Sequence, residues 1–498
     1  MTEHSHEIPE PDVSAENPIS DNWVWVGAHR PAIPRRFFDH MTKKWAPSGL
    51  GSEANPAATF TARRREALAG QFPDATLIIP TGNYKVRAND TNYRFRAGTD
   101  FFYLTACHDP DVVLVITNES DTVTSTLYVA ERRDHSTHEY FTDAHYGELW
   151  VGPRRGVAES ATHFGIATKP LEQLEADIAG ITTSRRAVVR GFDAHVDSLV
   201  APTDDDHPLV EYLSHMRLTK DEFEIAQLQV AIDHTTTAFE DVVRALPEAV
   251  GRGERVIEGI FNLRARLEGN DVGYETIAAS GSHATILHWV RNDGVVRNGD
   301  MVLLDAGVEC DYLYTADVTR TMPVNGTFSP IQRRIYELVL KAQRAGIAAV
   351  KPGAKFSEPH EAAMRVIAEG LFELGILDVE PDVALRRDMQ LHRRYTLHGT
   401  SHMLGLDVHD CANARNEMYV GELQPGYVLT VEPGLYFQPN DLTVPEEYRG
   451  IGVRIEDDVL VTATGHRVLS RALPTDPDEI ESWMKTVQAR GLTNLGLS

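Results

Sequence analysis

Cysteine is scarce in this chain of 498 residues, and long apolar runs and an excess of basic residues are missing from it. Its three cysteines, Cys107, Cys310 and Cys411, form neither an even set nor a closely spaced one. This argues against a disulfide framework and against a thiolate zinc site. We therefore expect a reducing, cytoplasmic compartment, with the thiols serving as small buried packing groups.

No apolar stretch approaches the roughly 18 residues that a membrane span needs, so we expect no membrane contact. The first residues, Met1–Glu7, are polar and acidic, which is unlike a signal peptide. Lysine and arginine total 48 against 73 acids, and the formal net charge of -25 argues against nucleic acid as a partner. We expect a soluble cytoplasmic enzyme.

The length of the chain and its 42% hydrophobic content predict two or three domains with sizeable cores. We assign residues 1–50 to an acidic disordered tail and a docking segment, because residues 1–20 hold acids and prolines but no lysine or arginine. The aromatic residues that follow, among them Trp23, Trp25 and Trp45, are expected to dock on a neighbouring surface such as another subunit.

Residues 51–218 are expected to form an amino-terminal α/β domain with a mixed sheet. Helical and strand-like segments alternate here, with helices at 63–70 and 171–180 and strands at 76–80, 112–117, 127–130 and 187–190. This region shows no cluster of potential metal ligands in its sequence. We therefore expect it to be a structural and oligomerising domain.

Residues 219–498 show the order helix, helix, paired strands, and then the same order again. A capping box at Thr219–Glu222 predicts the start of a long helix, and Ser329 followed by Pro330 and Gln332 predicts another. Further helices are expected near 254–267 and 357–374. The predicted fold class is α/β (α+β).

Asp305, Glu432 and Glu456 each follow apolar residues that are typical of a buried strand. A carboxylate buried in a strand is costly unless it is paired or binds a metal. Any single one could be a salt-bridged or edge-strand acid. The set, with His402 between its members and Asp317 shortly after Asp305, favours a metal site.

The proposed ligands are carboxylates and one imidazole, which favours manganese, cobalt, zinc or magnesium. Four carboxylates carry too much negative charge for a single ion, so we expect two dications about 3.5–4 Å apart, held by bridging carboxylates. His398 and His402 have the spacing of the zincin helix motif. Gly399 stands where that motif needs glutamate, so the zincin interpretation fails.

The order Asp305, Asp317, His402, Glu432, Glu456 resembles the metal-ligand set of the pita-bread metallopeptidases. The wording around these residues most resembles aminopeptidase P, the Xaa-Pro aminopeptidase. The matching segments are Leu304–Gly307, Asp317–Thr321, His398–Asp410, Thr430–Tyr436 and Pro445–Asp458, and the resemblance extends from about Thr59 to the end of the chain. The spacer between Asp305 and Asp317 is slightly longer than is usual in the bacterial enzymes, and we expect a longer hairpin turn near Asp311.

This resemblance implies a pita-bread catalytic domain and a role for each ligand. Asp305 would chelate one ion, Asp317 and Glu456 would bridge the two ions, and His402 and Glu432 would complete the other shell. The two divalent ions are expected to be Mn2+, with Co2+ or Zn2+ as alternatives. They would lower the pKa of a bridging water and supply hydroxide at neutral pH, with Glu432 as the proton acceptor.

The resemblance also implies residues that line or support the substrate site. His409 would stabilise the oxyanion, His288 would position the substrate, and His398 would line the site. Arg454 precedes Glu456 at a spacing that puts both side chains on one face of a strand. It would clamp a ligand carboxylate, or else belong to an unrelated salt bridge.

The activity implied by the resemblance is hydrolysis of the bond between an N-terminal residue and a following proline. The partners would be peptides with proline at the second position, and the enzyme would be a homo-oligomer, dimer or tetramer. Two alternatives remain open: prolidase, which cleaves Xaa-Pro dipeptides, and a peptide-binding protein on a degenerate peptidase fold. The complete ligand set argues against the second alternative.

Overall fold

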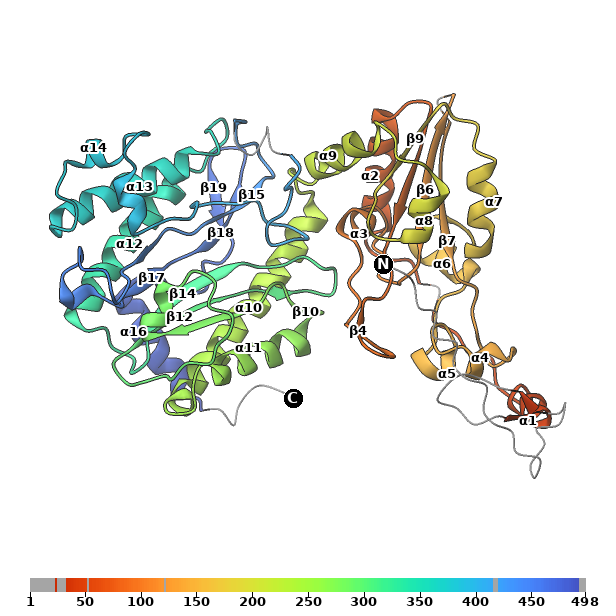
Figure 1. Cartoon of the computed structure of the whole chain (residues 1–498), viewed down its shortest axis with the longest axis horizontal. Helices are drawn as coiled ribbons and strands as arrows, with labels where there is room; N and C mark the ends of the chain where they lie inside the picture. The colour runs from red at the N-terminus through yellow and green to blue at the C-terminus, as the bar shows by residue number, and fades with distance from the viewer. Residues whose placement is uncertain (1–22, 25–32, 52, 121, 415–419, 492–498) are drawn as a thin grey trace, which may run out of the picture. The chain divides into compact units, whose positions relative to one another are not determined.

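The computed structural model describes residues 23–24, 33–51, 53–120, 122–414 and 420–491 of the chain (Figure 1). The chain divides into two compact units, Met1–Asp206 and His207–Ser498. This division falls ahead of the boundary that we expect at residue 219, and helix α9 (Asp206–Met216) occupies the interval. The disordered tail expected over residues 1–20 lies outside the described residues.

The first unit alternates short helices with strands. Its helices are α1 (Arg35–Met41), α2 (Ala58–Gln71), α3 (Thr99–Thr105), α4 (Glu139–Thr142), α5 (Glu148–Val151), α6 (Val157–Phe164), α7 (Leu174–Ala179) and α8 (Ala194–Leu199). Its strands are β1 (Trp23–Val24), β2 (Ile33–Pro34), β3 (Ala75–Pro80), β4 (Val86–Ala88), β5 (Thr91–Asn92), β6 (Val113–Glu119), β7 (Thr122–Val129), β8 (Ala167–Pro170) and β9 (Arg185–Val188).

A five-stranded mixed sheet in the order β8-β7-β6-β3-β9 forms the centre of the first unit. β3, β6 and β7 pair antiparallel, while β8 and β9 at the two edges pair parallel to their neighbours. Residues of one sheet face, including Ile78 and Val115, pack with residues of α7 and α8. The predicted mixed-sheet domain is confirmed, although the last strand begins at Arg185, earlier than the predicted 187.

The second unit carries longer helices. Besides α9 they are α10 (Glu222–Ala249), α11 (Arg255–Glu268), α12 (Pro330–Ala349), α13 (Glu358–Glu373), α14 (Pro381–Ala384) and α16 (Pro477–Gln488). Its strands are β10 (Asp271–Val272), β11 (Ile277–Ser280), β12 (Met301–Ala306), β13 (Val308–Glu309), β14 (Val318–Pro323), β15 (Val428–Val431), β16 (Gly434–Tyr436), β17 (Gly452–Arg454), β18 (Asp457–Val461) and β19 (His466–Val468).

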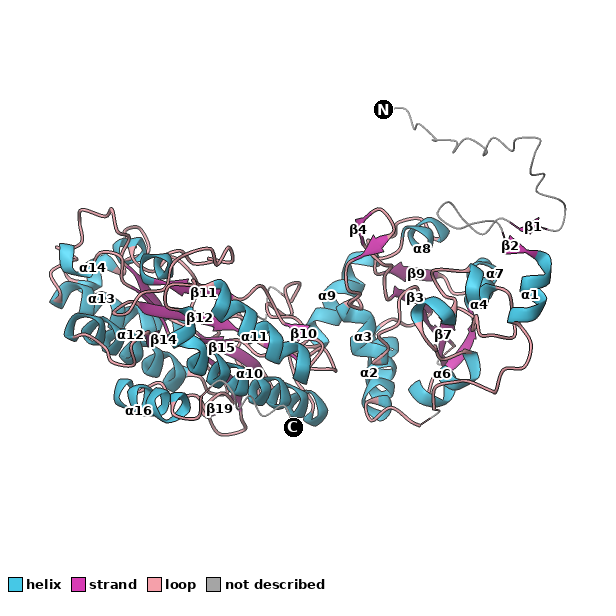
Figure 2. Cartoon of the chain, turned by 90° about the horizontal axis from the view of Figure 1, so that it is seen from below, coloured by secondary structure: helices cyan, strands magenta, loops and turns pink. Residues whose placement is uncertain are grey.

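Two similar halves make up the second unit. In the first half α10 contacts α11, and the strands form the antiparallel sheet β11-β12-β14; in the second half α12 contacts α13, and the strands form the antiparallel sheet β15-β18-β19. Figure 2 shows α10 along the side of this unit, with α16 next to it. The predicted order of helix, helix and paired strands, repeated once, is confirmed.

The two predicted capping boxes have different outcomes. Ser329 caps α12 as predicted, with Pro330 in the first turn: the Ser329 hydroxyl accepts from the backbone N–H of Gln332, and the Gln332 side-chain oxygen accepts from the backbone N–H of Ser329. The box predicted at Thr219 is wrong, because Asp221 is the cap of α10 and Glu224 is its partner. The two overlapping motifs compete, and the carboxylate of Asp221 is the group that accepts the hydrogen bond from the backbone of the first turn.

The largest cluster of buried apolar side chains fills the space between the helices and strands of the second unit. It includes Phe239 of α10, Phe261 of α11, Leu304 of β12, Ile335 of α12 and Ile367 of α13. This packing fixes the strands from which the proposed metal ligands project. No helix in the described part of the chain has both the length and the apolar character needed to cross a membrane.

Candidate metal centre

The first half of the second unit positions two aspartates. Asp305 lies in β12, and Asp317 directly precedes β14, whose Thr319 pairs with Asp305 in the antiparallel register. The connection includes β13 and a turn in which the backbone N–H of Cys310 donates to the Tyr314 carbonyl oxygen and Leu313 takes a φ of 61°. Both carboxylates are therefore held by adjacent strands beyond a turn that includes Asp311, as the sequence predicts.

The second half positions one histidine and two glutamates. His402 lies beside β15, where the backbone N–H of Thr430 donates to the His402 carbonyl oxygen at 3.0 Å. Glu432 directly follows β15, and Glu456 lies between β17 and β18. The backbone N–H of Glu456 donates to the Thr319 carbonyl oxygen at 3.2 Å, so this acid is anchored to the strand that follows Asp317.

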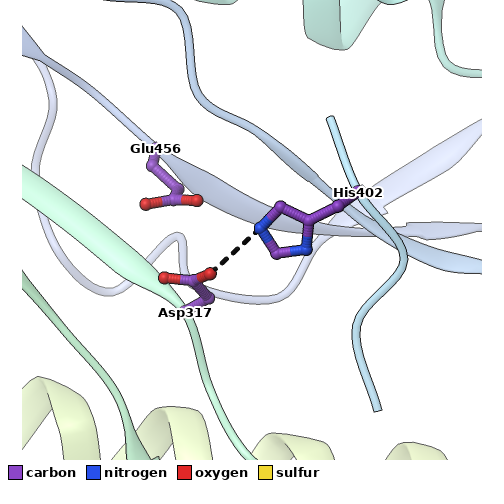
Figure 3. Close-up of side chains that lie close together, drawn as sticks. All are labelled: Asp317, His402 and Glu456. Carbon is purple, nitrogen blue, oxygen red and sulfur yellow. Dashed lines mark ion pairs between the residues drawn. The ribbon is translucent and has the colours of Figure 1, made fainter. Parts of the chain in front are cut away.

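Asp317, His402 and Glu456 converge from three separate segments (Figure 3). Each offers one potential ligand atom, and these atoms all lie within 4.8 Å of one another. Nε2 of His402 lies 3.2 Å from a carboxylate oxygen of Asp317 and 3.5 Å from one of Glu432. Asp305 joins the group through Tyr274, whose hydroxyl contacts both Asp305, at 2.7 Å, and Asp317.

The orientation of His402 suits a metal ligand. Its Nδ1 lies 3.1 Å from the backbone carbonyl oxygen of Met403, which can only accept a hydrogen bond, so Nδ1 carries a proton. Nε2 is thereby directed at the carboxylates. A backbone acceptor on one ring nitrogen is the usual arrangement for an imidazole that binds a metal through the other.

The carboxylates are crowded and buried, and their pKa values reflect this. Burial raises the pKa of Glu432 to about 7; the charge of Asp317 adds to the rise and His402 opposes it. Burial and the charges of Asp317 and Glu432 raise the pKa of Glu456 well above its usual value. Without a cation, this cluster retains protons that dications would replace, so the donor set fits divalent metal ions.

His402 takes up part of this negative charge. Burial alone would lower its pKa, but the hydrogen bond and the charge of Asp317 raise it to about 9. The ring is then protonated at neutral pH in the metal-free protein. A bound dication would displace that proton, because a ligating imidazole nitrogen must be free of hydrogen.

Arg454 contacts Asp305, and it lies at the boundary between the two halves. Its guanidinium donates to Asp305, to the hydroxyl of Thr319 at 3.2 Å and to the hydroxyl of Tyr436 at 3.0 Å. Thr319 in turn donates to Glu456 at 2.6 Å. β17 ends at Arg454, before Glu456, yet both side chains contact the Thr319 hydroxyl and therefore lie on the same side of the chain, as predicted.

A cavity of about 830 Å3 opens onto the proposed ligands, and its lining includes all four of the further residues predicted from the sequence. These residues are His288, His398, His409 and Arg454. Apolar side chains also line the cavity, namely Ile277, Leu287, Val290 and Val408. The structure thus brings every predicted site residue to one cavity.

His398 and His409 are both uncharged at neutral pH. Burial and the charge of Arg454 lower the pKa of His398 to about 4, and its ring accepts a hydrogen bond at Nε2 from the Tyr436 hydroxyl, 2.7 Å away. The ring of His409 lies 4.3 Å from that of His402, centroid to centroid. Burial and the neighbouring His402 lower the pKa of His409.

Sequence reasoning missed three supporting residues, Tyr274, Thr319 and Asp458. Tyr274 contacts two of the proposed ligands, and Thr319 donates to a third. Asp458 accepts a hydrogen bond from the backbone N–H of Asp317 at 3.2 Å. Asp458 was visible as the last acid of the run after Arg454, whereas no pattern in the sequence distinguishes Tyr274 from a surface tyrosine.

Comparison with known proteins agrees with this architecture. The family model "Aminopeptidase P, N-terminal domain" matches residues 61–189, and that of "Metallopeptidase family M24" matches residues 226–463. A Xaa-Pro aminopeptidase 1 of Streptomyces coelicolor is 50% identical over 98% of this chain and 99% of its own length. The Xaa-Pro aminopeptidase of Escherichia coli is 35% identical over 85% of this chain and 96% of its own.

Solved structures show the same fold. An aminopeptidase of Pseudomonas aeruginosa matches with a TM-score of 0.78 and 31% identity, covering 88% of this chain and 100% of its own. Aminopeptidase P from E. coli, solved with the inhibitor Pro-Leu, matches with a TM-score of 0.77 and 32% identity, covering 89% and 100%. The predicted amino-terminal α/β domain followed by a pita-bread domain is confirmed, and the chain belongs to the Xaa-Pro aminopeptidases of metallopeptidase family M24.

Proposed function

We propose that this protein is a metal-dependent exopeptidase that hydrolyses the bond between an N-terminal residue and a following proline. The observation that carries the proposal is the convergence of Asp317, His402 and Glu456 at a cavity that also contains Asp305 and Glu432. This arrangement occurs in a chain that aligns almost end to end with Xaa-Pro aminopeptidases.

The proposed cofactor is a pair of divalent ions, manganese in the first instance. Asp305, Asp317, His402, Glu432 and Glu456 would hold the pair. Bound there, two dications would lower the pKa of a water molecule, polarise the scissile carbonyl and take up the free amine of the peptide. The carboxylate oxygens and single imidazole suit manganese, and cobalt or zinc would fit the same donors.

Glu432 is the proposed proton acceptor. Burial raises its pKa to about 7 in the metal-free protein, so the site tolerates the protonated carboxyl group better than water does. His398 lies 3.5 Å from the Glu432 carboxylate and stays neutral, so it lines the site without competing for that proton. Glu432 can therefore receive a proton from the attacking water and pass it to the leaving nitrogen.

His409 is the proposed donor to the oxyanion. A neutral imidazole keeps one N–H, which can donate to a carbonyl oxygen as negative charge develops there. The lowered pKa of His409 keeps the ring neutral beside His402. His288 lines the same cavity and is the proposed positioning group for the substrate.

Proline at the second position sets specific demands on the site. The bond before proline is a tertiary amide without an N–H, and the ring fixes φ. A site for this bond needs an apolar wall rather than an acceptor for a backbone N–H. Ile277, Leu287, Val290 and Val408 line the cavity and can supply such a wall.

A peptide panel tests the proposed function. The manganese-loaded protein should release the first residue from Xaa-Pro-Yaa tripeptides and act little on the same peptides with alanine second. N-acetylation should block cleavage because it removes the free amine. Faster cleavage of an Xaa-Pro dipeptide than of the tripeptide would instead identify a prolidase, and cleavage of acetylated peptides would exclude an aminopeptidase.

We further propose a cytoplasmic homo-oligomer, a dimer or a tetramer, that forms through the first unit. The three cysteines, Cys107, Cys310 and Cys411, are buried and free, which supports the cytoplasmic location. Helix α5 leaves Trp150 about half exposed, with Leu149 and Val151 exposed beside it, which supports an interface on the first unit. Light scattering after size exclusion gives the subunit number directly. A monomer at micromolar concentration would contradict the oligomer.

A further inference from the structure

Glu254 lies outside the ligand set, yet its buried carboxylate accepts four hydrogen bonds. It directly precedes α11, and its side chain is fully inaccessible. The donors are the backbone N–H of Ser280 at 2.8 Å, Nδ1 of His283 at 2.8 Å, Nε1 of Trp289 at 2.7 Å and the backbone N–H of Gly294 at 2.7 Å. All four belong to one segment, residues 280–294.

The segment 280–294 forms part of the cavity wall. Its side chains Leu287, His288 and Val290 line the cavity that opens onto the proposed ligands. The donors to Glu254 stand at both ends of the segment and on either side of His288. The Glu254 carboxylate therefore fixes the segment by hydrogen bonds on either side of the residues that line the cavity.

The surroundings of Glu254 are closely packed. The rings of His283 and Trp289 stack with centroids 3.9 Å apart at an interplanar angle of 27°. A Cβ added at Gly294 would lie 2.4 Å from the His283 ring and 2.7 Å from the Glu254 carboxylate. The backbone N–H of Glu254 also donates to the Gly294 carbonyl oxygen at 3.0 Å.

A second contact fixes the same segment to the sheet. Asn292 is fully buried and takes a φ of 47°. Its side-chain oxygen accepts from the backbone N–H of Ala278 at 3.0 Å, and its amide donates to the Thr276 carbonyl oxygen at 2.9 Å. The segment is thus attached to β11, which pairs with the strand of Asp305.

We propose that Glu254 is a positioning residue of the peptidase, one that holds residues 280–294 so that His288, Leu287 and Val290 face the substrate. The inference rests on the proposed function. A carboxylate is suited to this role because both of its oxygens accept and neither donates. A glutamine would direct its NH2 group at two of the four donors and lose those hydrogen bonds.

The test compares Glu254→Gln with a matched control, Asp241→Asn. Asp241 is also buried in the same unit, and its carboxylate accepts hydrogen bonds from Arg244 and Arg264 of helices α10 and α11. Both variants should lower the melting temperature. Only Glu254→Gln should reduce kcat/KM on Xaa-Pro-Yaa peptides, by roughly tenfold to a hundredfold, which is the loss expected when a substrate is misplaced. The reduction should come mainly from a higher KM, and the metal content should be unchanged.

Two measurements report on the segment without using activity. Amide hydrogen exchange at Ser280 and Gly294 should accelerate in Glu254→Gln and not in Asp241→Asn. The emission of Trp289, assigned by difference from Trp289→Phe, should shift as its indole loses its acceptor. Should Glu254→Gln fail to fold, Trp289→Phe removes a single donor and should still raise KM.

Each outcome has a defined meaning. Wild-type kcat/KM in Glu254→Gln, with a melting temperature lowered as much as in Asp241→Asn, would overturn the inference and leave Glu254 a purely structural acid. Unchanged exchange at Ser280 and Gly294 would overturn it as well. An inactive wild-type protein on Xaa-Pro peptides would refute the proposed function instead, and the exchange and emission measurements would still decide the role of Glu254.

Discussion

Arg454 donates a hydrogen bond to Asp305 across the boundary between the two halves of the second unit, so the protein itself supplies one positive charge to its own carboxylate cluster. Both side chains are almost completely buried. Neighbouring acids and Tyr436 hold the pKa of Arg454 well above its usual value, although burial opposes them. This pair offsets part of the repulsion among the acids of the cluster.

Replacing Arg454 should therefore destabilise the metal-free protein. Arg454→Ala leaves Asp305 buried without its partner, and the free energy of unfolding should fall by about 3 kcal/mol. The stability of Arg454→Lys should lie between that of the wild type and that of Arg454→Ala, because an ammonium group cannot match the planar guanidinium that reaches Asp305, Thr319 and Tyr436. Urea denaturation in the presence of chelator measures both, with Arg386→Ala, which breaks only an exposed pair with Asp388, as the control.

Removing metal should lower both activity and stability. Asp305, Asp317, Glu432 and Glu456 repel one another in the absence of cations, and dications that bind only the folded state stabilise it by mass action. Chelation should abolish peptide cleavage and lower the melting temperature, and added Mn2+ should restore both. Activity that survives complete metal removal would refute the mechanism, and the absence of tightly bound dications would revive the peptide-binding alternative.

The metal-free protein should lose stability as pH rises above neutrality. The pKa of His402 rises from 6.5 to about 9 on folding, so its stabilising proton is fully bound below pH 6.5 and is lost as pH passes through 9. That loss is worth on the order of 3 kcal/mol. The pKa of Glu432 rises from 4.5 to about 7 on folding, so its ionisation also lowers the stability of the folded protein as pH rises, in the range below pH 7.

His398 acts in the opposite direction at lower pH. Its pKa falls from 6.5 to about 4 on folding, so it adds stability above pH 6.5 and removes it as pH falls through 4. The range from pH 7 to pH 9 therefore excludes the titration of His398 and tests His402 together with Glu456, whose raised pKa acts in the same direction as that of His402. Urea denaturation of the chelated protein at these limits checks the sign, and His402→Gln should flatten the dependence.

Metal content should distinguish variants of the proposed ligands from variants of the other proposed catalytic residues. Asp317→Ala removes a proposed bridging carboxylate, so metal and nearly all turnover should be lost together. His409→Ala should keep both metals and lose mainly kcat, because the oxyanion donor acts in the transition state. Metal analysis beside steady-state kinetics distinguishes the two, and equal metal loss in His409→Ala would make His409 a ligand.

Three of the proposed ligands could be predicted from the sequence because each breaks a strong local rule, whereas the ligand roles of Asp317 and His402 came from the resemblance to aminopeptidase P. Asp305, Glu432 and Glu456 stand directly after apolar strand residues, where a carboxylate needs a partner. The helix cap at Ser329 was predictable for a related reason, since cap and partner lie within one turn. At Thr219 two such local motifs overlap, and only the folded backbone decides between them.

Contacts between distant segments could not be derived in this way. Glu254 looks like an ordinary acid at a helix start, and its four donors become visible only when residues 280–294 fold over it. Arg454 was identified as a clamp, but its partner Asp305 lies in another half of the unit. Such pairings depend on tertiary packing, which local periodicity does not encode.

Tyr274 is the supporting residue that sequence reasoning missed most completely, and it provides the last prediction. Its hydroxyl contacts Asp305 and Asp317 together, and burial with the charges of these acids raises its pKa well above the usual value. Tyr274→Phe removes the shared donor and nothing else. The metal-free protein should lose about 2 kcal/mol of unfolding free energy, as expected for a hydrogen bond to a charged group.

Tyr336→Phe is the matched control for this change. Tyr336 is fully buried in the same unit, and its hydroxyl donates to the Thr475 carbonyl oxygen at 2.8 Å, away from the proposed ligands. Both variants should destabilise the fold, but only Tyr274→Phe should weaken metal binding, by about tenfold, since the two carboxylates lose the group that orients them. Calorimetric titration with Mn2+ measures this difference. Equal affinity in the two variants would mean that the strands alone orient Asp305 and Asp317, and that Tyr274 serves only to stabilise the metal-free state.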